Sequence, residues 1–136
     1  MNYENFGNIR VRTYAASGAI PIDGVLVKIY GTDDYNKDVV YSLLTDEDGI
    51  TKAVALPAPP RAYSVAPGAK EAPYSVYNVE IAKSGFYPKR IDNVPIFQGV
   101  DAVLPIEMLP LLYDSDGNII PQANLNSVIY ENEHLE

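Results

Sequence analysis

Short runs of alternating apolar and polar residues, separated by turn residues, make up most of this chain. Residues 9–14 alternate apolar side chains with Arg10 and Arg12, and residues 25–30 repeat the pattern around Val27. A period of two is typical of strands that bury one face. Both segments are therefore predicted to be strands that face one core.

The next two β-rich runs, residues 39–45 and 50–56, flank the sequence Asp46-Glu47-Asp48-Gly49. Aspartate tolerates the left-handed backbone region and glycine adopts a positive φ without strain, so this sequence suits a tight turn. The pattern predicts a β-hairpin whose arms are the two flanking runs. A second turn is expected at Asp23-Gly24, before the strand at residues 25–30.

The second half of the chain continues in the same manner. Residues 57–73 contain five prolines, which excludes a central strand or a helix and predicts a long loop. In residues 74–83 the alternation places Tyr77, Val79 and Ile81 on the predicted core face. Residues 103–108 are expected to form the last strand.

No stretch shows the periodicity of an amphipathic helix, and seven or eight short runs are separated by turns. This pattern predicts an all-β fold, an antiparallel Greek-key β-sandwich of about seven strands. Residues 9–109 are expected to form the sandwich. Residues 1–8 would be a lead-in or linker, and residues 110–136 an acidic tail that is either disordered or laid on a neighbour as one more strand.

The charge distribution changes the expected partners. The chain has 136 residues and a net charge of -8, and all its lysines and arginines lie at or before Arg90. Eight acidic residues and no basic residue follow that position. Because no basic stripe is present to neutralise phosphates, a nucleic-acid partner is not expected. No apolar run is long enough to insert into a membrane, and the N-terminus lacks the features of a signal peptide.

Few residues are of the kinds that carry catalysis. The chain has no cysteine, and its one histidine, His134, is among the last three residues. A nucleophile–base pair or a histidine-containing metal centre therefore cannot be assembled, and we expect neither enzymatic activity nor a cofactor. Carboxylates at Glu71, Glu80 and Glu107 have no supporting motif, although a hydrolase that uses paired carboxylates stays open as a weaker alternative.

The acidic loops at residues 33–34, 46–49 and 114–118 carry oxygen-rich side chains of the kind that bind calcium. The spacing differs from that of a helix-loop-helix calcium site, because Gly117 follows its second aspartate directly and Ala123 stands where the last glutamate would be. Plain turns are the favoured interpretation of these loops.

Tyrosine is unusually frequent, with 11 residues against 3 phenylalanines and no tryptophan. Exposed rings on the loops of a sandwich can contact sugars or partner proteins. The candidate contact residues are Tyr63, Tyr74, Tyr77 and Tyr87. The alternative, that such rings only cover the end of the core, is favoured.

Several motifs together resemble a known family. They are Pro21-Ile22-Asp23-Gly24-Val25-Leu26-Val27, Thr45-Asp46-Glu47-Asp48-Gly49, Tyr77-Asn78-Val79-Glu80-Ile81 and Ser84-Gly85-Phe86-Tyr87. Over about residues 8–109 the chain resembles the carboxypeptidase regulatory-like domain, a transthyretin-like (prealbumin-like) β-sandwich. The sequences around residues 56–59, 73–79 and 93–97 look more narrowly like a module that accompanies clostridial peptidoglycan-binding and spore-cortex-lytic proteins.

The resemblance implies a non-catalytic accessory role in spacing, docking or assembly. The catalytic relatives of this sandwich, the hydroxyisourate hydrolases and intradiol dioxygenases, need more histidines than this chain has. The leading hypothesis is an accessory module of a bacterial envelope- or spore-associated protein with a protein partner, and self-association is possible. The alternative is a carbohydrate-binding module that recognises cell-wall glycan through the loop tyrosines.

Overall fold

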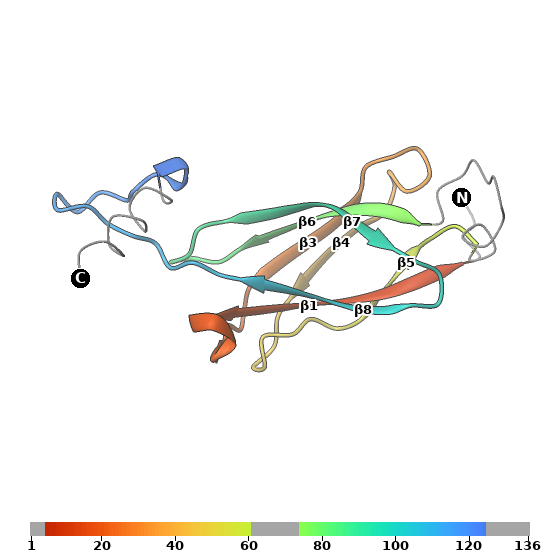
Figure 1. The fold of residues 1–136 in the computed structure, drawn as a ribbon, viewed down its shortest axis with the longest axis horizontal. Helices are drawn as coiled ribbons and strands as arrows, with labels where there is room; N and C mark the ends of the chain where they lie inside the picture. Colours follow the sequence, from red (N-terminus) through yellow and green to blue (C-terminus); the bar gives the residue numbers. More distant parts are fainter. Residues whose placement is uncertain (1–4, 61–73, 125–136) are drawn as a thin grey trace.

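The structure is a computed structural model, and it describes residues 5–60 and 74–124. Two β-sheets pack face to face in an elongated sandwich (Figure 1). The elements are β1 (Phe6–Ala15), η1 (Ala16–Gly18), β2 (Ile20–Pro21), β3 (Leu26–Gly31), β4 (Val40–Leu44), β5 (Val54–Pro57), β6 (Ser75–Ala82), β7 (Lys89–Ile96), β8 (Asp101–Glu107) and η3 (Gln122–Asn124). The predicted all-β sandwich is confirmed.

The first sheet is built around β1. Strands β5 and β2 follow each other along one side of β1 and are antiparallel to it. Strand β8 lies along the other side and is parallel to β1, with paired residues from Asn8 and Asp101 to Tyr14 and Glu107. This parallel pair departs from the purely antiparallel sheets that the sequence predicted. Strand β1 also begins at Phe6, three residues earlier than expected, because Phe6 pairs with Pro57 of β5.

The second sheet has the order β4-β3-β6-β7, and all its neighbours are antiparallel. Its last pair is irregular, since the register shifts between Tyr77 and Val79 of β6. Opposite this shift, Asn93 has a φ of 58° and its backbone N–H donates to Asn78 Oδ1 at 3.2 Å. The side-chain bond holds the bulge where the ladder is interrupted.

The core lies between the two sheets and follows the predicted alternation. Fifteen buried apolar residues form one cluster, to which β1 and β3 contribute alternate positions. The predicted core face of β6 is confirmed, because Tyr77, Val79 and Ile81 are all buried. Gly24 has the expected positive φ, 66°, at the turn into β3.

The predicted hairpin at residues 39–56 is wrong. Strand β4 pairs with β3, whereas β5 pairs with β1, so the turn at Asp46 to Gly49 carries the chain from one sheet to the other. The turn itself is present and has φ 75° at Gly49. The Gly49 carbonyl accepts the N–H of Thr13 at 2.7 Å, so the turn packs against β1 instead of closing a hairpin.

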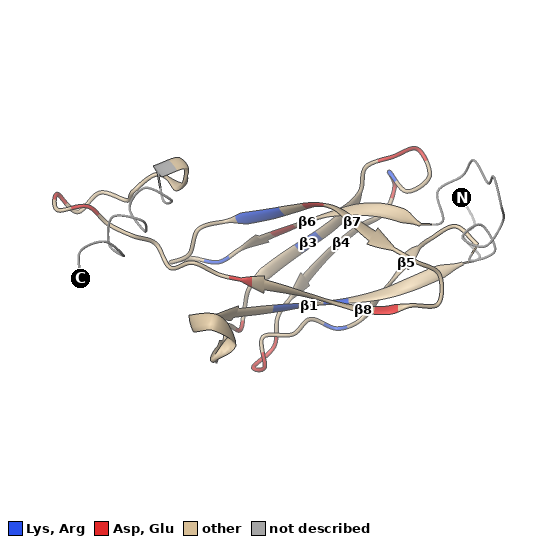
Figure 2. Ribbon diagram, in the orientation of Figure 1, with Lys and Arg blue, Asp and Glu red and all other residues tan. Residues whose placement is uncertain are grey.

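The first part of the expected tail, residues 110–124, is an extension that docks on the end of the sandwich, and the rest of that tail lies outside the described residues. The N–H of Leu111 bonds to the carbonyl of Gly85, and Tyr113 pairs with Ile119 across a tight turn. Residues 110–124 project beyond the end of the sandwich opposite the start of β1 (Figure 1). Their acidic residues lie at the outer tip (Figure 2). No helix within the described ranges is long and apolar enough to cross a membrane.

Candidate interaction surface

The structure separates the four candidate tyrosines. Tyr77 is 0% exposed and Tyr87 is 5% exposed, so neither ring can offer its face to a glycan or a partner, and the predicted contact role is wrong for both. Tyr77 lies on the core face of β6, and Tyr87 is covered by the extension that follows β8. Tyr74 stays exposed next to β6. Tyr63 lies outside the described residues.

The buried and half-buried tyrosines have a structural role that the sequence did not reveal. Their rings belong to the second sheet and its loops, and their hydroxyls donate to backbone carbonyls at the edge of the first sheet. Hydrogen bonds of this kind satisfy carbonyls that the sheet ladder leaves unpaired. The bonds are Tyr77 Oη to Pro57 O at 2.6 Å, Tyr35 Oη to Ala58 O at 3.2 Å and Tyr41 Oη to Ala55 O at 3.3 Å.

Tyr87 holds the extension against the sandwich. Its hydroxyl donates to the carbonyl of Ile120 at 2.6 Å and accepts the N–H of Leu112 at 3.2 Å. The backbone N–H of Tyr87 also bonds to the carbonyl of Leu109. One side chain thus fixes both arms of the small hairpin. The sequence predicts a contact role for Tyr87 because it does not show that residues 110–120 pack on the ring.

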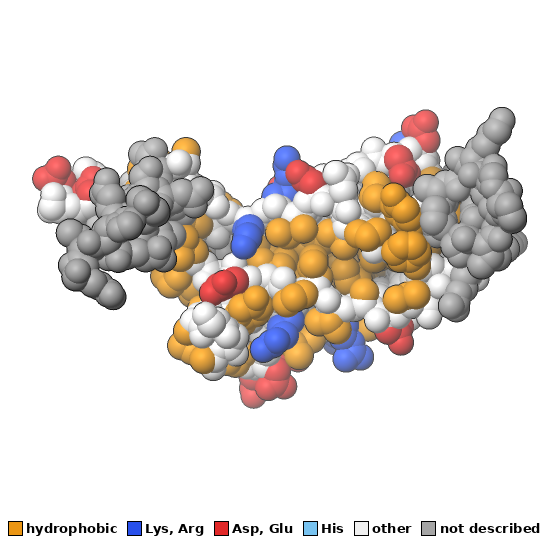
Figure 3. Space-filling view, viewed as in Figure 1, with side chains coloured by type: hydrophobic (Ala, Val, Ile, Leu, Met, Phe, Trp, Pro, Cys, Tyr) orange, Lys and Arg blue, Asp and Glu red, His pale blue; other side chains and the backbone are white. Residues whose placement is uncertain are grey.

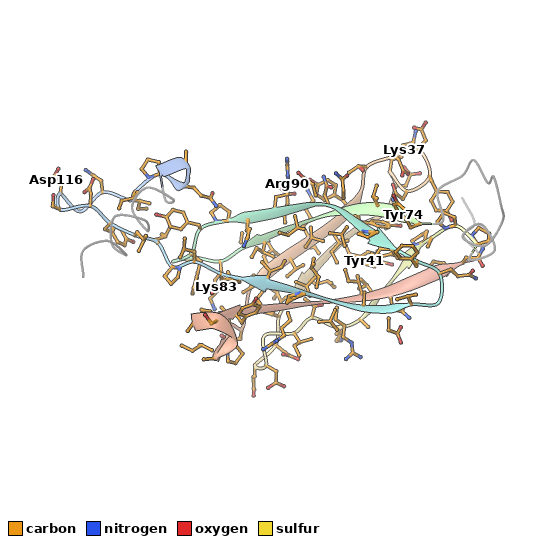
Figure 4. All side chains as sticks on the ribbon, viewed as in Figure 1. Lys37, Tyr41, Tyr74, Lys83, Arg90 and Asp116 are labelled. Carbon is orange, nitrogen blue, oxygen red and sulfur yellow. The ribbon has the colours of Figure 1, made fainter. Side chains whose placement is uncertain are left out.

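Among the described residues, Tyr74 is the one candidate tyrosine that stays exposed, and its ring lies beside that of Phe97. The rings of Tyr74 and Phe97 lie 5.3 Å apart between centroids and are tilted by 50°. Tyr74 precedes β6 at the end of the sandwich where β1 begins (Figure 4), and Phe97 directly follows β7. Figure 3 shows apolar side chains exposed in this region and along the side of the molecule where β7 and β8 lie.

Three of the four long sheet edges carry features that oppose pairing with another strand. Charged residues, proline and bulges are the usual protection of such edges. Strand β7 has Arg90, Asp92, Pro95 and the positive φ of Asn93.

The two edges of the first sheet are protected by proline and by side-chain bonds. Pro105 stands on the open side of β8, and the carbonyl of Glu107 on the same side accepts Lys89 Nζ at 3.3 Å. Strand β5 is short and ends in Pro57, and the carbonyl of Ala55 on its open side accepts the hydroxyl of Tyr41.

Strand β4 has no such protection. Its sequence, Val40-Tyr41-Ser42-Leu43-Leu44, contains no charge, no proline and no bulge. Val40 is 58% exposed and Leu44 is 64% exposed, and Leu26 of β3, next to Leu44, is also exposed. These three residues, the β4 apolar strip, lie on the outer face of the second sheet beside its open edge.

The backbone direction at this edge follows from two hydrogen bonds. Gly31 N donates to Val39 O, and Thr45 N donates to Val25 O. Odd-numbered residues of the segment therefore face β3, and the N–H and C=O groups of Val40, Ser42 and Leu44 point to the open side. No described residue pairs with β4 on that side.

The outer face of the second sheet also carries the main cluster of basic groups near the extension. Lys28, Lys89 and Arg90 line a shallow hollow of about 580 Å³ together with Glu80 and Gln122. The carboxylate of Asp92, 2.8 Å from Arg90 Nε, raises the pKa of the Arg90 guanidinium. Arg90 points into solvent (Figure 4). The charges of this hollow are partly compensated, and its described lining residues hold no converging set of catalytic groups.

The two acidic loops are turns with the same hydrogen-bond pattern. Asp46 Oδ1 accepts the N–H groups of Asp48 and Ile50 at 2.9 and 3.1 Å. Asp114 Oδ1 accepts those of Asp116 and Asn118, both at 2.9 Å. The first carboxylate of each loop is thus engaged by its own backbone, which supports the turn interpretation. Among the described residues no three carboxylate or imidazole groups come together as metal ligands.

Comparisons with known proteins show the fold and no family. No protein-family model matches the sequence, and no curated protein matches it. Among solved structures, the Bacillus anthracis TIE protein has a TM-score of 0.50 at 13% identity over 87% of this chain. The major pilin SpaD from Corynebacterium diphtheriae has the same TM-score, identity and coverage.

A cohesin–X-dockerin complex from Acetivibrio cellulolyticus has a TM-score of 0.47 at 19% identity over 93% of this chain. The chain spans 24% of the TIE protein chain and 35% of the SpaD chain. At 13% identity the likeness to the TIE protein and SpaD shows the fold alone, a β-sandwich.

Proposed function

We propose that this chain is a non-catalytic accessory module, a β-sandwich that spaces and connects parts of a larger bacterial envelope- or spore-associated protein and acts through contacts with proteins. The observation that carries the proposal is the parallel pairing of β1 with β8. Because the first and last long strands are neighbours and run in the same direction, the described chain enters the sandwich at one end and leaves it at the other (Figure 1).

The structural neighbours support this proposal at the level of architecture. In the TIE protein and the pilin SpaD the matching sandwich is one part of a longer chain. SpaD is described as a major pilin. The two sheets, one built on β1 and the other on β3, also support the prealbumin-like sandwich and the carboxypeptidase regulatory-like resemblance as the finer assignment.

An in-line module of this kind has a testable mechanical property. Tension applied at the two ends slides β1 along β8, so the hydrogen bonds of seven paired positions resist the movement together. Tension applied at one end instead opens the same bonds one after another, like a zipper. Forced unfolding depends on the unfolding barrier, so the two directions of pulling should give different rupture forces.

The experiment uses the absence of cysteine in the chain, which allows handles to be attached at chosen sites. One variant carries Asn5→Cys and Pro110→Cys, at opposite ends of the β1–β8 pair, and the control carries Asn5→Cys and Val100→Cys, at the same end. Single-molecule force spectroscopy should give a rupture force several-fold higher for the first variant. Equal rupture forces for the two variants would contradict the proposal that the β1–β8 pair resists tension along the chain.

The second candidate function is glycan binding, and the exposed Tyr74–Phe97 pair is the observation in its favour. Two exposed rings side by side can stack against a sugar. The test is co-sedimentation with purified, insoluble peptidoglycan, with Tyr74→Ala as the variant and Val103→Ala as the control. Retention that is lost only in Tyr74→Ala supports this function, and absence of retention by the unaltered protein rules it out.

A further inference from the structure

The β4 edge offers more than a generic contact, because it is complementary to a second copy of itself. Strand β4 has Val40 and Leu44 placed symmetrically on either side of Ser42. If two copies pair antiparallel about a two-fold axis at Ser42, each Val40 stands opposite the Leu44 of the other copy and Ser42 stands opposite Ser42. We infer that this chain self-associates through antiparallel pairing of β4 with β4, a step that goes beyond the spacer role and does not depend on it.

The backbone groups satisfy this arrangement. The N–H and C=O groups of Val40, Ser42 and Leu44 all point to the open side of the edge, so the facing residues form the hydrogen-bonded pairs of an antiparallel ladder. A shift of the register by one residue would place outward-directed groups opposite inward-directed ones and lose the ladder. A shift by two would set Val40 against Ser42 and leave Leu44 opposite Asp38.

The side chains on the outer face fit the same register. In each copy Leu44 is next to Leu26, and Val40 is next to Tyr30. The pairing therefore joins these into a continuous row across the two copies, which covers the β4 apolar strip. The neighbouring row is polar: Ser42 lies beside Lys28 in each copy, and in the dimer the two Ser42 residues face each other. Apolar pairs opposite each other across strands stabilise a sheet, and an exposed apolar edge is otherwise a liability.

Charged residues flank the β4 apolar strip at both ends of the edge. Lys52 lines the surface beside Leu44, and Asp38 lines the surface beside Val40. The two-fold axis brings the Lys52 end of one copy to the Asp38 end of the other, twice. Asp46 also lies at this junction and faces Asp38 of the other copy, and like charges opposite each other weaken the pairing, which agrees with a weak dimer.

The contact is small by the standards of permanent dimers, which bury far more than a five-residue edge can. The expected behaviour is therefore a weak, concentration-dependent dimer in solution. When several copies are held on one surface or in one assembly, the local concentration makes the same contact effective.

Disulfide trapping tests the register. Hydrogen-bonded antiparallel partners have Cα atoms about 5.5 Å apart, within the span of about 4.4 to 6.8 Å that a disulfide bridges. Because the chain has no native cysteine, Ser42→Cys should oxidise to a covalent dimer. Val40→Cys should not link to itself, since the two positions lie about 14 Å apart along the strand. A mixture of Val40→Cys and Leu44→Cys should give the mixed dimer.

Sedimentation of the unaltered full chain from micromolar to millimolar concentration tests the association itself. The weight-average mass should rise with concentration, and Val40→Lys should weaken the association at least tenfold. Val103→Lys is the matched control, because Val103 is 59% exposed on β8, almost as Val40 is on β4, and this variant should associate like the unaltered protein.

Three outcomes overturn the inference: a monomer at every concentration, equal weakening by both lysine variants, or trapping of Ser42→Cys no faster than of Val103→Cys. Circular dichroism confirms that each variant is folded. The rupture-force comparison described above is made on single molecules, so failure of self-association and failure of the spacer role are told apart.

Discussion

At the scale of single residues, the tyrosines both fill the space between layers and donate hydrogen bonds. A phenol ring is large enough to fill a core and still carries a polar group that must find a partner when it is buried. In this sandwich the partners are backbone carbonyls of the opposite sheet, for Tyr77, or of the extension, for Tyr87. The high tyrosine content is therefore explained in large part by packing between layers.

The Tyr77 hydroxyl gives a direct prediction. Tyr77→Phe removes the donor to the buried Pro57 carbonyl and leaves that acceptor without its bond, so the free energy of unfolding should fall by about 1–3 kcal/mol. Urea denaturation followed by circular dichroism measures it. Tyr41→Phe is the control, because its bond to the Ala55 carbonyl is exposed and water can replace it. Equal losses in the two variants would contradict the argument.

At the scale of elements, the loop between β3 and β4 determines how the β4 edge is presented. Asn36 is fully buried, and its Nδ2 donates to the Val76 carbonyl of β6 at 2.8 Å while its Oδ1 accepts the N–H of Asp33. Gly31 makes room for this residue, since a Cβ at position 31 would lie 2.1 Å from the Asn36 carbonyl oxygen. The Asn36 side chain therefore holds the loop on the sheet, and the absence of a Cβ at Gly31 leaves the space that Asn36 needs.

Gly31→Ala should therefore displace the loop and destabilise the protein by about 2 kcal/mol or more, because the atom in the way belongs to the backbone and cannot rotate aside. Hydrogen exchange should accelerate most at Gly31, whose N–H donates to the carbonyl of Val39 and closes the loop, and at Val39, whose N–H donates to the carbonyl of Asn36. Ser42→Ala, on the exposed face of β4, is the control. Unchanged stability of Gly31→Ala would show that the loop adapts.

At the scale of the whole molecule, the sandwich and the extension are two parts of unequal strength. The sandwich has one continuous apolar core, whereas the extension leaves Tyr113 and Ile119 exposed and is attached through Tyr87 and a few backbone bonds. Regions with few buried apolar contacts open at lower free energy than the core. The extension should therefore detach without unfolding of the sandwich.

Tyr87→Phe tests this division. The variant loses both the donor to Ile120 and the acceptor for Leu112, so amide exchange and proteolysis of residues 111–120 should accelerate about fivefold or more, as loss of about 1 kcal/mol implies. The thermal midpoint of the sandwich should change little. Pro88→Ala, on the neighbouring surface, serves as the control variant. A large fall in the midpoint would show that the extension is part of the core unit.

The sequence determined the strands, because burial of one face imposes a period of two that is visible without knowing the neighbours. It predicted the core residues Tyr77, Val79 and Ile81 and the turns at Gly24 and Gly49 for the same local reason. Strand pairing is different. The partners of β4 and β5 were predicted wrongly because closeness in sequence favours a hairpin, whereas the bond between Thr13 and Gly49 and the two separate sheets favour a crossing.

The candidate site was decided almost entirely by the tertiary structure. A tyrosine beside a glycine corner or next to prolines has the same local sequence whether its ring is exposed or covered, and only the packing of residues 110–120 buries Tyr87. The open edge of β4 is equally invisible in sequence, because a strand with apolar residues on both faces is typical of a central position. Only the sheet order shows that β4 lies at an edge, with its outward backbone groups facing no other described strand.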